Sequence, residues 1–325
     1  MNRLAVLLNE KDVVIADGAM GTSQIRLGLA NGASGELWNL ECPHKIAQIH
    51  AGFAAAGADI LLTNTFGANR VALASHGLGS RVREINQAGV AIAREIADKA
   101  GRPIVVAGDI GPLGGLLEPL GKRAVVEAEE AFLEQAEALK ESGVDIAWIE
   151  TMLADNELDA AIRAVQGVGL PYVRTMTFDR AGRTIMGVRP EDAMRRIRTI
   201  GWKPIAFGAN CGAGPAQMID SVISMVRGAE DEAIVVAKGN CGLPVIDENL
   251  RTTYSGTPEI MGTYACMARD AGARIIGGCC GTTDEHIRYM VDALMKRPRR
   301  AAPTYAEIES ALGPVKNTAK GSKPG

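Results

Sequence analysis

The chain has 325 residues, of which 47% are hydrophobic and 22% are charged, with 38 glycines and a formal net charge of −3. This composition is typical of a globular protein with a large core, and the small net charge argues against a nucleic-acid or membrane surface as partner. No apolar run approaches the roughly 18 residues of a transmembrane helix, and the N-terminal apolar stretch is too short for a secretory signal.

Short apolar runs rich in β-forming residues recur at regular intervals along the chain. Each is nearly continuous in hydrophobicity, which is typical of parallel strands that are buried on both faces. The eight predicted strands are residues 13–17, 59–64, 104–109, 145–150, 172–178, 205–211, 234–240 and 274–279. Segments with helical spacing of apolar residues lie between them. The clearest of these are 124–142, 190–199, 216–227 and 258–270.

Eight strand–helix units predict an α/β protein with a (β/α)8 TIM barrel over residues 1–296. A doubly wound parallel sheet is the structural alternative, although no GxGxxG motif follows the first strand to support dinucleotide binding. Residues 297–325 are predicted to form a flexible basic C-terminal extension, because the composition becomes basic and then rich in lysine, glycine and small polar residues. A short helix is expected near residues 305–312.

Polar residues follow the apolar runs at seven of the eight predicted strand ends. In a TIM barrel these carboxyl ends build the active site. Taken singly, Asp17 or Asp109 could as well cap the following helix. Seven polar ends together predict a site. The residues at these ends include Asp17, Asn64 with Phe66 close behind it, Asp109, Glu150, Asn210, Cys211, Asn240 and Cys279.

Three of the six cysteines lie at predicted strand ends. Six cysteines in a long chain are more typical of metal binding or catalysis in a reducing compartment than of a secreted disulfide scaffold, so a cytoplasmic location is expected. Cys42 and Cys266 are interpreted as packing residues. Cys241 follows the seventh strand and is a weaker candidate ligand.

Cys211 ends the sixth predicted strand, and the adjacent Cys279 and Cys280 end the eighth. If these ends meet, three thiolates converge, and three protein ligands plus one exchangeable position is the arrangement of a catalytic zinc site. Neighbouring side chains of a straight strand point to opposite faces, so the backbone must bend there, as the flanking glycines permit. A redox dithiol of Cys279 and Cys280 is the competing interpretation.

Four segments together resemble the homocysteine S-methyltransferase family. They are DGAMGT at residues 17–22, TNTF at 63–66, GANC at 208–211 and GGCCGT at 277–282, and the resemblance extends from residue 5 to residue 295. Within the family, the chain is most similar to the stand-alone bacterial betaine–homocysteine methyltransferases. This similarity rests on ELWN at 36–39, AWIET at 147–151, KGNCG at 238–242 and YSGTP at 254–258.

The resemblance implies a zinc-dependent barrel enzyme that transfers a methyl group from a cationic donor to the thiol of L-homocysteine, giving methionine. It implies Zn²⁺ binding by Cys211, Cys279 and Cys280, with the zinc activating the substrate thiol as a thiolate. The resemblance also implies that Asp17 and Glu150 bind the ammonium group of homocysteine. Its carboxylate is implied to bind backbone N–H groups of the turn that contains Gly18, Ala19, Met20 and Thr22. Asn64 and Phe66 are implied to lie near the substrate, and Asn240 is implied to lie at the open zinc position.

Glycine betaine is the favoured donor, and Trp38 is the expected aromatic partner of its quaternary ammonium, in an interaction worth about 0.5–2 kcal/mol. Gly67 and Thr151 stand where the animal betaine enzymes have tyrosines, so the matched aromatic cage is incomplete. S-methylmethionine, another sulfonium or betaine, or a methyl-corrinoid on a separate protein are the alternative donors. The sequence leaves the oligomeric state open, and a homo-oligomer is compatible with it.

Overall fold

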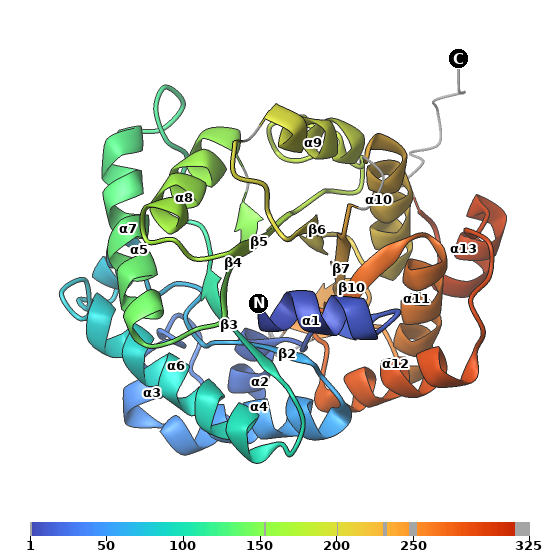
Figure 1. The fold of residues 1–325 in the computed structure, drawn as a ribbon, viewed down its shortest axis with the longest axis horizontal. Helices are drawn as coiled ribbons and strands as arrows, with labels where there is room; N and C mark the ends of the chain where they lie inside the picture. Colours follow the sequence, from blue (N-terminus) through green and yellow to red (C-terminus); the bar gives the residue numbers. More distant parts are fainter. Residues whose placement is uncertain (1, 153, 200, 230–232, 247–251, 316–325) are drawn as a thin grey trace.

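The computed structural model describes residues 2–315 except 153, 200, 230–232 and 247–251. Its centre is a sheet of eight parallel strands surrounded by helices (Figure 1). The strands are β1 (Val14–Ile15), β2 (Ile60–Leu62), β3 (Val105–Ile110), β4 (Ile146–Met152), β5 (Tyr172–Met176), β6 (Ala206–Cys211), β7 (Val235–Gly239) and β10 (Ala273–Gly278). All eight predicted strands are therefore confirmed.

The strand order shows that the sheet closes on itself. Neighbouring strands follow the order β1-β10-β7-β6-β5-β4-β3-β2, so each strand lies beside the next barrel strand in the sequence. Ala16 and Ile60 then form a parallel bridge that joins the two ends of this order. The predicted TIM barrel is confirmed and the doubly wound alternative is excluded, because an open sheet leaves its first and last strands apart.

The helices lie between consecutive strands and around the barrel. They are α1 (Arg3–Glu10), α2 (Met20–Arg26), α3 (Trp38–Glu41), α4 (Pro43–Ala56), α5 (Arg70–Ala74), α6 (Val82–Lys99), α7 (Val125–Glu141), α8 (Asp155–Gly167), α9 (Pro190–Arg196) with a 3-10 turn at Ile197–Thr199, α10 (Pro215–Gly228), α11 (Pro258–Asp270), α12 (Asp284–Lys296) and α13 (Tyr305–Leu312). Proline occupies the first turn of α4, α9, α10 and α11, where its missing N–H is not needed. Among the described residues, no helix has the length and apolar character to span a membrane.

A pair of strands that the sequence analysis did not predict lies outside the barrel order. β8 (Pro244–Ile246) and β9 (Thr252–Tyr254) pair antiparallel in the connection between β7 and α11. This hairpin brings Tyr254 against the loop after β10, because a side chain at Gly281 would lie 2.4 Å from the Tyr254 ring. The connection therefore contributes to the carboxyl end of the barrel.

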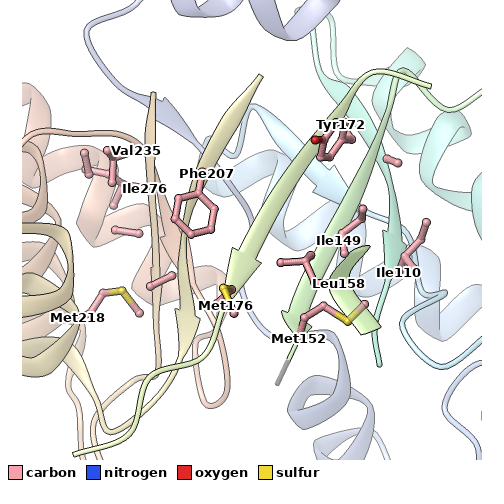
Figure 2. Close-up of a cluster of buried hydrophobic side chains, with 14 of the residues drawn as sticks. Ile110, Ile149, Met152, Leu158, Tyr172, Met176, Phe207, Met218, Val235 and Ile276 are labelled. Carbon is pink, nitrogen blue, oxygen red and sulfur yellow. The ribbon is translucent and has the colours of Figure 1, made fainter. Parts of the chain in front are cut away.

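Alternation along the strands divides the core into two layers. One set of positions packs outward against the helices, as Figure 2 shows for Ile149 and Phe207 of the strands with Leu158 and Met218 of α8 and α10. The other set points into the barrel. The inner layer contains Val14, Ile60, Leu62, Val105, Ala107, Ile146, Trp148, Val173, Ala206, Val236 and Ile275. Successive strand residues alternate between the two faces. Because both layers are apolar, every position of a strand is apolar and the run in the sequence is continuous.

Helix α1 covers the amino end of the barrel (Figure 1). Its buried residues Leu4, Leu7 and Leu8 join the inner layer of the core. The guanidinium of Arg274 donates to the backbone oxygens of Leu8 and Lys11, which holds the end of α1 against β10. Fully burying a leucine contributes about 1.5–3 kcal/mol, so α1 stabilises the barrel while closing this end.

Residues 297–315 lie against the barrel, where the sequence analysis had predicted a flexible extension. The expected short helix is confirmed as α13, in which Ile308 is fully buried. The Tyr305 hydroxyl donates to Asp220 of α10 at 2.6 Å, and Arg299 forms an ion pair with Asp12. The helix packs against the barrel through apolar residues on one face, Ile308 and Leu312, and the basic composition of the segment does not prevent this packing. The predicted extension's last residues, 316–325, lie outside the described residues.

Candidate active site

The inward-facing positions change from apolar to charged toward the carboxyl ends of the strands. Asp109, Glu150 and Lys238 each follow a buried inward residue of β3, β4 or β7 by two positions, so they point into the same space. All three are at least nine-tenths buried. They line a cavity of about 260 Å³ at the carboxyl end of the barrel. The periodicity that fills the barrel therefore also positions its charged site.

Most of the predicted site residues line this one cavity. The predicted residues in its wall are Asp17, Gly18, Ala19, Met20, Thr22, Asn64, Phe66, Glu150, Cys211, Cys279 and Cys280. Trp38 and Asn240 are not part of the wall. Asp109, whose strand end the sequence analysis recognised without giving it a ligand role, is also part of the wall, and so is Lys238, which the sequence analysis did not assign to the site.

The three predicted zinc ligands converge. The sulfur atoms of Cys211, Cys279 and Cys280 all lie within 4.8 Å of one another. The predicted bend is present after β10, where Gly281 has a φ of 83°. On the other side of the cluster, Cys211 itself has a φ of 61°, in the left-handed region that side chains rarely adopt. The backbone turns at both strand ends are what bring the three thiols together.

The donor set fits a zinc ion. A tetrahedral zinc with Zn–S bonds of about 2.3 Å holds its sulfur ligands about 3.8 Å apart, which the observed cluster allows. Hydrogen bonding with Cys211 is the largest cause that raises the pKa of Cys279, and burial adds to it. A coordinating divalent metal has the opposite effect on a thiol.

Asn240 lies at the edge of the cysteine cluster. Its Nδ2 donates to the backbone oxygen of Gly212 at 2.8 Å, while its buried Oδ1 has no hydrogen-bond partner among the described residues. A hydrogen bond with Asn240 is also among the influences on the pKa of the Cys211 thiol. This hydrogen bond places the Asn240 amide beside Cys211, which is compatible with the implied position of Asn240 next to the metal.

A buried lysine joins the two predicted ammonium-binding carboxylates. Lys238 Nζ lies 3.2 Å from Asp17 Oδ1 and 3.9 Å from Glu150 Oε2. It also lies 5.4 Å from the centre of the Trp148 ring, and Trp148 Nε1 donates to Glu150 Oε2 at 3.1 Å. The sequence analysis missed Lys238 and Trp148 as site residues. The strand period would have found them, since Lys238 is two positions after the inward residue Val236 and Trp148 is two positions before Glu150.

Burial governs the protonation of this charged cluster. Desolvation raises the pKa of Asp17, although the charge of Lys238 acts to lower it. Desolvation likewise raises the pKa of Glu150, again with Lys238 acting in the opposite direction. A buried carboxylate is costly unless it is paired. The lysine is therefore the main influence that favours the charged forms of both acids.

Asn210 connects the acidic side of the cavity to the cysteine side. Its Oδ1 accepts the Thr151 backbone N–H at 3.0 Å and the Thr175 hydroxyl at 2.8 Å, and its Nδ2 donates to the Thr151 hydroxyl at 2.7 Å. Thr151 has a φ of 62° and follows Glu150 directly. Asn210 precedes Cys211. One amide thus holds together the ends of β4, β5 and β6, and β4 and β6 contribute residues to the cavity wall.

Trp38 is not brought to the cavity. It begins α3, is only 8% exposed, and has the ammonium of Lys45 4.5 Å from its ring centre. The loop after β1 folds this side chain into packing against α4, so one ring face already has a cation. Phe66, by contrast, lines the cavity and is 36% exposed.

Two further predicted contacts are used within the protein. Both groups of the Asn64 amide are engaged, since Nδ2 donates to Gly35 and Asn39 while Oδ1 accepts from Gln24. The backbone N–H of Ala19 donates to Thr282 at 3.0 Å. Asn64 and Ala19 therefore shape the wall, and neither of these groups is free for a ligand in this conformation.

The other cysteines lie apart from the cluster of three sulfurs. Cys241 is buried, with its sulfur 3.1 Å from His286 Nε2 and 3.1 Å from the Gly256 backbone oxygen. Its backbone N–H donates to the Cys280 backbone oxygen at 2.9 Å. Cys241 thus supports the loop that holds Cys280 through the backbone. Cys42 lies between α3 and α4, and Cys266 lies within α11.

Comparison with known proteins decides what this barrel is. Residues 14–294 match the family model described as homocysteine S-methyltransferase. The chain belongs to the homocysteine S-methyltransferase family. As a member of that family it is a methyltransferase, and the reaction of the family is methyl transfer to homocysteine.

Relatives of this homocysteine S-methyltransferase family member include two much longer proteins. Both are named methionine synthase. The one from Mycobacterium tuberculosis (strain ATCC 25618 / H37Rv) is 33% identical over 92% of this chain and 26% of its own length. The one from Mycobacterium leprae (strain TN) is 30% identical over 87% of this chain and 24% of its own length. The chain thus spans about a quarter of the length of the curated relatives that it matches.

A solved structure of similar fold is the homocysteine methyltransferase MmuM from Escherichia coli. Its metallated form matches with a TM-score of 0.75 at 23% identity, over 89% of this chain and 99% of MmuM. At this level of identity the match establishes a shared barrel fold across nearly the whole of MmuM. It agrees with the family assignment.

Proposed function

We propose that this chain transfers a methyl group from a small cationic donor, glycine betaine in the first instance, to the thiol of L-homocysteine, with zinc held by Cys211, Cys279 and Cys280. The observation that supports this proposal most directly is the convergence of three cysteine sulfurs within 4.8 Å at the wall of an acidic cavity. Three thiolates with room for a fourth ligand are the donor set of a catalytic zinc site.

Each part of the cavity has a role in this reaction. Zinc, when bound, lowers the pKa of a coordinating thiol, so that a substrate thiol is present as the more nucleophilic thiolate. The cysteines fix where that thiol lies, and the buried carboxylates fix the ammonium end of the same small molecule. Holding an amino acid at both ends orients its sulfur toward the donor, which is the entropic part of catalysis.

The charge of the cavity favours a cationic donor. Four carboxyl groups, those of Asp17, Glu36, Asp109 and Glu150, share the wall with one lysine. An anionic donor would meet repulsion there, whereas betaine or a sulfonium compound would not. S-methylmethionine, another sulfonium or betaine, and a methyl-corrinoid on a separate protein are the alternative donors.

A redox function of Cys279 and Cys280 is the second candidate. Adjacent thiols can form a disulfide, but a two-cysteine reaction does not need Cys211. The third sulfur, which lies within 4.8 Å of the other two, favours metal binding over a dithiol.

The proposal is tested with a panel of methyl donors. Zinc-loaded protein is incubated with L-homocysteine and one deuterium-labelled donor at a time: betaine, S-methylmethionine, a dimethylsulfonium compound or methylcobalamin. We expect labelled methionine from betaine, detected by mass spectrometry, and none after zinc is removed by a chelator. Label from another donor alone would replace betaine in the proposal. No labelled methionine from any donor would refute methyl transfer to homocysteine by this chain.

Two aromatic substitutions identify the donor site. Phe66 lines the cavity and Trp38 does not, so Phe66→Leu should raise the KM for a cationic donor more than Trp38→Leu does. A cation–π contact worth about 0.5–2 kcal/mol corresponds to an increase of about 2- to 30-fold in KM. Initial rates at saturating homocysteine measure it. A larger increase from Trp38→Leu would return the role to the residue that the sequence predicted.

A further inference from the structure

The cysteines of the proposed zinc site are themselves possible methyl acceptors. A zinc-bound cysteine is a thiolate, and a thiolate is a nucleophile. Cys280 is half-buried and lines the cavity in which the donor would react. If Cys280 attacked the donor, an Sγ–CH3 bond would form, the bond between the donor and its methyl group would break, and the donor would leave with that electron pair. A thioether would then stand in place of a thiolate ligand, so something must direct the methyl group to the substrate sulfur instead.

Tyr254 contacts the loop of Cys280 but is not part of the cavity wall. It ends β9, which pairs with β8, and its ring lies over Gly281, where an added Cβ would lie 2.4 Å from the ring. Two backbone bonds support this approach. The N–H of Gly256 donates to the Cys241 oxygen at 3.0 Å, and the N–H of Cys241 donates to the Cys280 oxygen at 2.9 Å. The hairpin is thus fixed to the loop after β10.

The Tyr254 hydroxyl forms a hydrogen bond with the Cys280 side chain. Burial is the largest cause that raises the pKa of Tyr254, the charge of Cys280 comes next, and this hydrogen bond adds to them. Hydrogen bonds with Cys211 and Cys279 are the largest influences on the pKa of Cys280, and the bond with Tyr254 acts to lower it. A bond with these two effects has the phenol as donor and the thiolate as acceptor.

The other two cysteines of the cluster also have a side-chain donor beside them. Asn210 Nδ2 donates to Cys279 Sγ at 3.9 Å, and Asn240 is hydrogen-bonded to Cys211. A hydrogen bond stabilises a thiolate and makes it a weaker nucleophile, just as nucleophilicity falls when the pKa of a thiol falls. Both amides also bond to backbone groups, so Tyr254 is the donor that a substitution tests most directly.

We propose that Tyr254 protects Cys280 from methylation by donating a hydrogen bond to its zinc-bound sulfur, so that the methyl group goes to the substrate thiol. This inference rests on the proposed function, because it requires zinc at the three cysteines. Tyr254 is a positioning residue in this role, since it acts through Cys280. The hairpin of β8 and β9 then has a function in the reaction, because it carries this hydroxyl to the sulfur.

The test measures methylation of each cysteine by tandem mass spectrometry of its peptide. Wild-type protein and Tyr254→Phe, loaded with equal zinc, are exposed to deuterated iodomethane without homocysteine. Iodomethane gives its methyl group to sulfur and releases iodide, so the result does not depend on the natural donor. Cys280 should react about 3- to 10-fold faster in Tyr254→Phe, because part of the lost hydrogen bond to a charged group appears as nucleophilicity. Cys211 should change by less than about twofold.

Metal-free protein distinguishes loss of the hydrogen bond from greater exposure of Cys280. Without zinc, Cys280 is mostly a protonated thiol at neutral pH. Losing a donor to the thiolate does not increase the amount of thiolate, so Tyr254→Phe should then react no faster than wild type. An equal increase with and without zinc would mean that the substitution only opens a path to Cys280, and it would overturn the proposal. Tyr305→Phe is the matched control, because its hydroxyl donates to Asp220 of α10, and it should leave the rate at Cys280 unchanged.

The outcomes separate this inference from the function on which it rests. If wild-type protein binds no zinc, the proposed function is wrong and the inference falls with it. If both proteins bind zinc and Cys280 reacts at the same rate in each, the role of Tyr254 is wrong while the proposed function stands. If Tyr254→Phe does not fold, as judged by circular dichroism, Tyr254→Met, which also lacks the hydroxyl, takes its place. A faster reaction at Cys280 that requires zinc supports the inference.

Discussion

Replacing Cys211 with glycine or with alanine should abolish zinc binding in both cases, yet leave the metal-free glycine variant the more stable of the two. Cys211 has a φ of 61°, and a residue with a side chain costs about 1–2 kcal/mol in this region. Glycine adopts it freely but loses more conformational entropy on folding. The expected difference in unfolding free energy between the two metal-free variants is about 1 kcal/mol.

The measurements are zinc per chain by mass spectrometry and urea unfolding after chelation. Both variants should fall from about one zinc to none, with methyl transfer at background, because losing even an outer-shell partner of a metal ligand costs about 10- to 100-fold in affinity. Cys241→Ala is the control, since this buried thiol contacts His286 instead of the cluster, and it should keep its zinc. Retention of zinc by Cys211→Ala would show that Cys211 is not a ligand.

Replacing Lys238 with methionine should destabilise the folded protein by about 3–5 kcal/mol at neutral pH, the cost of removing one partner of a buried ion pair. Lys238 is 3% exposed and is the cation that pairs with Asp17 and Glu150. Methionine has a similar length and fills the same space. The loss is therefore mainly electrostatic rather than a loss of packing.

The deficit should depend on pH in a defined direction. Burial already raises the pKa of Asp17 and Glu150, and Lys238 opposes this, so the variant's folded-state pKa values rise further above the unfolded values near 4. Between these two values the folded state binds more protons than the unfolded state, and stability falls as pH rises. The deficit should thus be smallest below about pH 4 and largest once pH exceeds the raised pKa values.

Chemical unfolding of Lys238→Met and wild-type protein across the pH range checks this prediction. Adding Asp17→Asn to Lys238→Met should recover part of the loss, because the uncompensated charge is gone while the oxygen that accepts from Leu62 remains. Lys140→Met is the control. Lys140 is exposed at the end of α7, and its loss should change stability by no more than about 0.5 kcal/mol. A pH-independent deficit would contradict the electrostatic explanation.

The strands were predictable from the sequence because both layers of the barrel core are apolar. Each run from β1 to β10 contains an inward and an outward set, so hydrophobicity is continuous and its interruptions mark the ends. The three cysteines were predictable for the same reason, since they follow such runs. Closure of the sheet then places them at one rim.

Lys238 was not predicted as a site residue because the sequence does not show which side chains face a charged residue inside an apolar run. Only the register with β10 and the opposing carboxylates show what it does: Lys238 pairs with Gly277 across the sheet, and its side chain reaches Asp17. Asp109 illustrates the same limit. Its strand end was recognised, but whether it caps a helix or faces the cavity depends on the inward direction of β3.

The position of Trp38 outside the cavity wall was not predicted, because loop conformation does not follow from periodicity. The segment after β1 folds into α2 and α3, and contacts such as that between Trp38 and Lys45 decide which aromatic ring is accessible. The strands β8 (PVI) and β9 (TTY) escaped prediction for a related reason: neither lies in a continuous apolar run of the kind that marks the barrel strands. Local turns and tertiary contacts determine such segments.

The packing of α1 against the inner core has a consequence for the order in which molecules move. With Leu4 and Leu7 filling the amino end of the barrel, two substrates and two products must all pass through the carboxyl-end opening, where Phe66 is partly exposed and the charged cluster is buried. If, as proposed above, the amino acid binds at the buried carboxylates and the donor binds nearer the opening beside Phe66, the amino acid must arrive before the donor and leave after the demethylated donor. A barrel closed at one end thereby imposes a sequence of binding and release on a reaction between two small molecules.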